Sequence, residues 1–93
     1  WRTASSGGAT LMRLDVGGFL SIGNGSNVAN ASSILDLTST TKGFLPPRMT
    51  GAQAEAIGTP ATGLMVYANN GNGATINSTG WWGYNGTTWV KLN

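Results

Sequence analysis

Apolar and polar positions alternate in short stretches of the first third of the chain. Met12, Leu14 and Val16 alternate with two charged residues, so that apolar and charged side chains fall on opposite faces of an extended segment. This period of two is typical of a half-buried strand. A Gly-Gly pair separates this stretch from a second one and suits a two-residue turn. We therefore expect residues 11–16 and 19–22 to form a hairpin.

Further strand-like runs lie at residues 34–37 and 63–67, and two more flank an Asn-Gly pair, at 81–84 and 87–92. Asn-Gly between strand-like runs is the strongest local signal for a hairpin. The chain is thus expected to end in a β-hairpin, with a polar loop over residues 69–79 before it.

One short helix is expected at about residues 51–57. Thr50 and Gln53 have the spacing of a capping box. A Pro-Pro pair at 46–47 prevents an earlier start, and it favours an extended segment there. A helix of this length is too short to be stable alone, so we expect Ile57 to anchor it by packing.

The C-terminal hairpin carries two different faces. With a two-residue turn, Trp82 would lie opposite Trp89, which predicts one face bearing Trp82, Tyr84, Trp89 and Lys91. The other face would carry Trp81, Thr88, Val90 and Leu92. We expect the second face to be the core and the first to be more accessible.

Composition points to assembly between chains. Leu, Ile, Val and Phe together number 18 of 93 residues, just under the ~20% level that indicates a thin core. Small domains usually compensate with disulfides, metals or oligomerisation. Without cysteine, disulfides are impossible, and without histidine and with three carboxylates, metal ligands are scarce. Oligomerisation is left.

The same composition argues against several functions. Histidine, the commonest general base and metal ligand, is missing. Asp15, Asp36 and Glu55 are far apart in sequence, and a glycosidase pair about 5–10 Å apart could form only between chains. The five basic residues form no patch for nucleic acid, and no apolar run approaches the ~18–20 residues of a membrane span. We expect no enzyme, no cofactor, no metal site, no nucleic-acid partner and no membrane insertion.

Two segments resemble known fibre proteins. RLDVGGFLSIGNGS resembles the glycine-punctuated strand–turn repeat of phage tail fibres and related bacterial surface proteins. The string ASSILDLTSTTKGFLPPRMT, followed by GLMVY and WWGYNGTTWVKL, is similar to a module of phage fibre proteins and of secreted bacterial proteins. This second match covers Ala31 to Leu92.

The resemblance implies an all-β fold with one short helix, in an elongated, intertwined homotrimeric fibre segment that ends in a β-hairpin. Residues 1–30 would be a β-repeat shaft or linker segment, and residues 31–93 the fibre module with the helix and hairpin.

The implied function is structural and adhesive: a segment of a trimeric phage or viral tail fibre that contributes to host-surface attachment. Its partners would be two further copies, a host cell-surface glycan or protein, and other fibre or virion proteins, in an extracellular virion tail fibre. The alternative is a bacterial extracellular filament or cell-surface adhesin that uses the module purely for assembly.

Two sets of residues are candidates for these roles. The receptor-binding candidates, because aromatic rings stack on sugars beside polar groups, are Trp82, Tyr84, Trp89 and Asn85; the alternative for these rings is the hairpin's own core or the trimer seam. The candidates for the trimer interface or core are Leu14, Leu35, Leu37, Phe44, Leu45, Ile57, Leu64, Val66, Trp81, Val90 and Leu92.

Four charged residues have alternative roles that the sequence leaves open. Asp15 and Asp36 could bind a cation on a threefold axis, or be solvated or paired with arginine. Lys42 and Arg48 could cap carbonyls, pair with acids across a trimer, or grip an anionic polysaccharide.

Overall fold

The chain forms two compact units in a computed structural model that describes residues 2–4, 10–23 and 30–93. The first unit comprises Trp1–Phe44 and the second Leu45–Asn93. The first unit extends past residue 30 because the strand expected near residues 34–37 pairs with an earlier strand of that unit. The expected assignment of residues 1–30 to a shaft or linker and of residues 31–93 to the fibre module stays a prediction.

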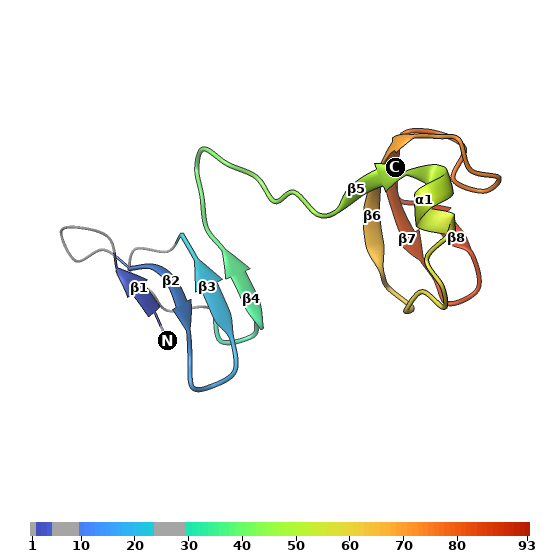
Figure 1. Cartoon of the computed structure of the whole chain (residues 1–93). Coiled ribbons are helices and arrows are strands. Elements are labelled where there is room, and N and C mark those ends of the chain that lie inside the picture. The colour runs from blue at the N-terminus through green and yellow to red at the C-terminus, as the bar shows by residue number, and fades with distance from the viewer. Residues whose placement is uncertain (1, 5–9, 24–29) are drawn as a thin grey trace. The chain divides into compact units, whose positions relative to one another are not determined.

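The first unit is a four-stranded sheet in the order β1-β2-β3-β4 (Figure 1). Its strands are β1 (Arg2–Ala4), β2 (Thr10–Leu14), β3 (Leu20–Ile22) and β4 (Leu35–Leu37). The pairs β1–β2 and β2–β3 are antiparallel, whereas β3 and β4 run parallel. Three of these strands match expected strand positions, while β1 lies in a segment without a strand pattern.

The turn between β2 and β3 is one residue longer than expected. The Asp15 N–H donates to the Phe19 carbonyl oxygen at 2.9 Å, and the Gly18 N–H donates to the Asp15 carbonyl oxygen at 2.9 Å. Gly18 has φ of 87°, in the left-handed region that glycine adopts without strain. The predicted two-residue Gly-Gly turn is therefore wrong: this is a three-residue loop that ends in a left-handed residue.

The second unit is also a four-stranded sheet, in the order β5-β6-β7-β8. It consists of β5 (Arg48–Thr50), α1 (Gly51–Glu55), β6 (Met65–Asn70), β7 (Gly80–Tyr84) and β8 (Trp89–Lys91). β5 and β6 are parallel and are joined through α1, whereas β6–β7 and β7–β8 are antiparallel. α1 packs against β5 and β6 (Figure 1).

The capping box of α1 is confirmed. The Gln53 N–H donates to Thr50 Oγ1 at 3.1 Å, and the Thr50 N–H donates to Gln53 Oε1 at 2.9 Å. The helix ends at Glu55, earlier than the expected 57. Ile57 follows the helix and packs, half-buried, against the core, as the anchoring argument requires.

The core of the second unit lies between one face of its sheet, α1 and the loop that follows β6. Its buried apolar residues are Ala54, Val66, Ala68, Ile76, Trp82 and Trp89. Val66 and Ile76 are the largest fully buried side chains, and burying such a side chain contributes about 1.5–3 kcal/mol to stability. The second unit therefore has an apolar core of its own.

The β7–β8 hairpin has a longer turn than Asn-Gly alone would give. Tyr84 lies opposite Trp89 and Trp82 opposite Lys91, so the predicted pairing of Trp82 with Trp89 is wrong. Asn85 Oδ1 accepts hydrogen bonds from the N–H groups of Thr87 and Thr88, each at 2.9 Å, which stabilises a four-residue loop. The register differs from the expected one by two residues, so the same side chains still share each face.

The expected fold class, nearly all β with one short helix, is confirmed for the described residues. Among those residues, no helix is long and apolar enough to cross a membrane.

Candidate functional site

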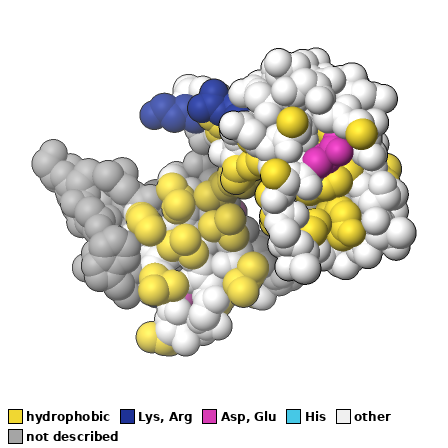
Figure 2. All heavy atoms as spheres, turned by 45° about the vertical axis from the view of Figure 1, so that its right-hand side comes forward, with side chains coloured by type: hydrophobic (Ala, Val, Ile, Leu, Met, Phe, Trp, Pro, Cys, Tyr) yellow, Lys and Arg dark blue, Asp and Glu magenta, His cyan; other side chains and the backbone are white. Residues whose placement is uncertain are grey.

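The strands β2, β3 and β4 place aliphatic side chains in two rows across one face of the first sheet. One row is Met12–Ile22–Leu37 and the other is Leu14–Leu20–Leu35, because paired residues of neighbouring strands point to the same side. We call these six residues the aliphatic face. Figure 2 shows hydrophobic side chains gathered on the first unit, beside the grey atoms.

The aliphatic face is largely open in the single chain. Ile22, Leu35 and Leu37 have exposed fractions of 38%, 45% and 43%. Val16, which follows β2, is fully exposed. A sheet normally buries its apolar face against another layer, so this exposure is the opposite of what an isolated domain would show.

The polar face of the same sheet is better covered. Arg13, Ser21 and Asp36 form its central row, and Ser21 is 3% exposed. An Asp36 carboxylate oxygen accepts a hydrogen bond from the Asn30 N–H at 2.7 Å. The polar groups on this side are thus held by local contacts within the unit.

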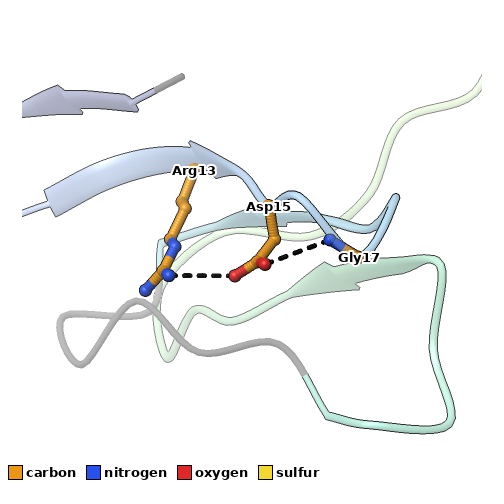
Figure 3. A network of polar contacts seen from close by, with 3 residues as sticks. All are labelled: Arg13, Asp15 and Gly17. Carbon is orange, nitrogen blue, oxygen red and sulfur yellow. Dashed lines mark hydrogen bonds and ion pairs between the residues drawn. The ribbon is translucent and has the colours of Figure 1, made fainter.

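Asp15 continues this polar side at the start of the turn. An Arg13 guanidinium nitrogen lies 3.0 Å from Asp15 Oδ2, and the Gly17 N–H donates to Asp15 Oδ1 at 3.3 Å (Figure 3). The Arg-paired alternative for Asp15 is therefore present. The described residues contain no group of three or more His, Cys, Asp and Glu side chains that could hold a metal ion.

The second sheet has an open face as well, on the side opposite its core. Met65, Val90 and Leu92 are exposed there. Tyr67 and Trp81 pair across β6 and β7 on the same side, with ring centroids 5.0 Å apart in an edge-to-face arrangement. We call these five residues the aromatic face.

The structure reverses the predicted roles of the two hairpin faces. Trp82 and Trp89 have exposed fractions of 5% and 8% and belong to the core, whereas Val90 and Leu92 are exposed. Trp82 Nε1–H also donates to the Ser78 carbonyl oxygen at 3.1 Å. The expectation that the Trp82 face is accessible is wrong, because α1 and the loop carrying Ile76 cover that side.

The other two receptor-binding candidates are more accessible. Tyr84 is half-buried, and its ring meets that of Trp89 edge-on at 5.5 Å. Asn85 is exposed at the hairpin loop. A receptor-binding role for either residue stays a prediction.

Some of the interface or core candidates are buried or half-buried in the single chain, and the others are exposed. Val66 is buried, and Ile57, Leu64 and Trp81 are half-buried. The exposed members are Leu14, Leu35, Leu37, Phe44, Leu45, Val90 and Leu92. In the single chain most of these candidates are therefore open to contact with another molecule.

Sequence reasoning missed residues on both sides of the second sheet and on the first. Ile76 is a core residue inside a polar loop, and no periodic pattern marked it. Ile22 and Met65 are exposed on the open faces, and the alternation of β3 and β6 was the signal that could have placed them there.

Comparison with known proteins assigns a role to a chain with such open faces. Residues 22–93 match a family model described as a phage tail like trimerisation region. This match includes Ile22, β4 and the entire second unit. No curated protein and no solved structure matches the chain. Since the match covers well over half of its residues, the chain belongs to the phage tail like trimerisation region family, a structural, trimeric, tail-type module.

Proposed function

We propose that this chain is a structural and adhesive segment of a trimeric phage tail fibre and contributes to attachment to the host surface. The observation that carries the structural part is the exposure of most large aliphatic side chains, together with membership of a trimerisation family. Contiguous exposed apolar patches are typical of interaction surfaces. Burial between three copies would remove them from water.

The adhesive part is supported by the trimer and by the hairpin loop. A trimer presents three identical sites on one particle, and linked weak sites bind with far higher avidity than one site alone. The loop of Asn85, Gly86, Thr87 and Thr88 is exposed, next to the half-buried Tyr84 ring. An aromatic ring beside amide and hydroxyl groups suits stacking and hydrogen bonding with a sugar.

Light scattering of the purified chain tests the assembly. We expect a mass about three times the 9.5 kDa of one chain. A folded monomer would contradict the structural part of the proposal.

A binding assay with labelled trimer and the bacterial cells that the parent particle infects tests adhesion. Tyr84→Phe removes only the phenolic oxygen and keeps the edge-to-face contact with Trp89. Asn85→Asp keeps a side-chain oxygen that accepts from Thr87 and Thr88. We expect both changes to reduce cell binding without changing the melting temperature. Trimers that assemble normally but bind no cells would favour the purely structural alternative.

A further inference from the structure

The first unit has no apolar core of its own among the residues whose burial is described. Among those residues, the buried apolar ones all lie in the second unit, and the buried residue of the first unit is Ser21, on the polar face. A domain needs at least two packed layers around a hydrophobic core. The described strands of the first unit form a single layer.

The aliphatic face has the chemistry of an interface centre. Its six positions are all Leu, Ile or Met, without a charged or polar side chain. The charged residues Arg13, Asp15 and Asp36 take part in contacts on the opposite side of the sheet. Interface centres are depleted in charge, while charged groups stay at the solvated periphery.

The family match supports further copies of this chain as the occupant of this face. The match begins at Ile22 and includes β4, so Ile22, Leu35 and Leu37 lie inside the trimerisation region, while Met12, Leu14 and Leu20 precede it. In a threefold assembly the same face of each copy turns toward the same axis. The occupant that fits is therefore a second and third copy of this chain.

We propose that the three copies associate through the aliphatic face of β2, β3 and β4, so that the first unit acquires its hydrophobic core between chains. This assignment rests on the proposed trimeric function. It also assigns the two units different sources of stability. The second unit has its own hydrophobic core before assembly, whereas the first unit obtains one from the neighbouring chains of the trimer.

A pair of matched substitutions tests the assignment in the full chain. Leu37 and Val90 are 43% and 42% exposed, and they lie on the short edge strands β4 and β8 of the two sheets. Leu37→Asp places a charge in the aliphatic face, and Val90→Asp places the same charge in the aromatic face. Light scattering gives the mass of each variant, and tryptophan emission, to which the buried Trp82 and Trp89 contribute, reports whether the core of the second unit stays folded.

We expect Leu37→Asp to lose the trimer and give a single-chain mass with native tryptophan emission, while Val90→Asp remains trimeric. Loss of the trimer in both variants, with native emission, would still support the assignment and add the aromatic face to the interface. A trimer that survives Leu37→Asp would overturn the assignment alone. A monomeric parent chain would overturn the proposed function and the assignment with it.

Thiol labelling gives a second measurement that does not depend on placing a charge in either face. The chain has no cysteine, so Leu37→Cys and Val90→Cys each introduce one unique thiol. We expect maleimide to label the Leu37→Cys variant several-fold more slowly in the trimer than after dilution to monomers, and the Val90→Cys variant at similar rates in both states. Equal labelling of the Leu37→Cys thiol in trimer and monomer would overturn the assignment.

Discussion

The Ile76 N–H donates a hydrogen bond to the Glu55 carboxylate, with 2.8 Å between the nitrogen and Oε2. The same oxygen accepts from the Thr75 N–H at 2.9 Å. A single side chain at the end of α1 thus holds the loop segment that contributes Ile76 to the core. The fully buried position of Ile76 depends on a contact between segments about twenty residues apart.

Removing this carboxylate should loosen the core of the second unit. Hydrogen bonds to a charged group contribute about 1.5–3 kcal/mol, so we expect Glu55→Ala to lower the free energy of unfolding by about that amount. Glu55→Gln keeps an accepting oxygen but no charge and should lose less. Urea denaturation at fixed chain concentration measures both, and parent-like stability of Glu55→Ala would show that other contacts hold the loop.

Trp82→Ala should lower the stability of the protein more than Trp82→Phe does. It is nearly fully buried between the sheet and its covering layer, so we expect Trp82→Ala to cost about 3–5 kcal/mol per chain. Trp82→Phe keeps most of the ring and loses the bond to the Ser78 carbonyl, so its loss should be smaller. Thermal unfolding followed by circular dichroism distinguishes the two, and an unchanged melting temperature for Trp82→Ala would contradict the buried position.

Gly51→Ala should destabilise the protein although alanine favours helix formation by about 0.8–1 kcal/mol. A Cβ at Gly51 would lie 2.3 Å from the Ile76 carbonyl oxygen and 3.0 Å from the Gly73 nitrogen, and both are backbone atoms. We expect this overpacking to cost about 1–3 kcal/mol. Chemical denaturation of the variant measures it.

Gly58→Ala is the matched control. A Cβ at Gly58 meets no atom within 4 Å, so the change should be neutral or stabilise by about 0.4–1 kcal/mol through the unfolded chain. Equal effects of the two substitutions would show that the close approach of Gly51 to the loop does not decide the outcome.

The capping box predicts a graded response at Thr50. Thr50→Ala removes the oxygen that accepts from the Gln53 N–H and should cost about 0.5–2 kcal/mol. Thr50→Ser and Thr50→Asp keep an acceptor and should be nearly neutral. The midpoint of urea unfolding ranks the variants, and equal losses for all three would assign the effect to packing of the Thr50 methyl group.

Local patterns predicted most of the strands and the helix start. Alternation predicted β2, short strand-like runs predicted β3, β4, β6, β7 and β8, and the Thr50–Gln53 spacing predicted the N-cap, because these features depend on neighbours in sequence. The turns were harder to predict from the sequence. The loop lengths at Asp15 and Asn85 depend on side-chain and backbone hydrogen bonds that the pairs Gly-Gly and Asn-Gly do not specify.

The sequence predicted several residues of the open faces, but it did not predict which faces are exposed and which are buried. Leu14, Leu35 and Leu37 were identified as interface or core positions, and all three are exposed on one sheet face. Trp82 was expected to be accessible and is buried. The difference arises because a repeating pattern states which side chains share a face, but not which segment covers it.

The sequence by itself determined which residues share each face of each strand, because side-chain direction alternates along an extended backbone. It also indicated a thin core, because Leu, Ile, Val and Phe together number 18 of 93 residues. The tertiary structure alone decided which faces are covered. In the second unit α1 and Ile76 bury the Trp82 side. In the first unit the aliphatic face stays largely exposed among the described residues. Covering a face requires contacts between segments distant in sequence, and a local pattern carries no information about them.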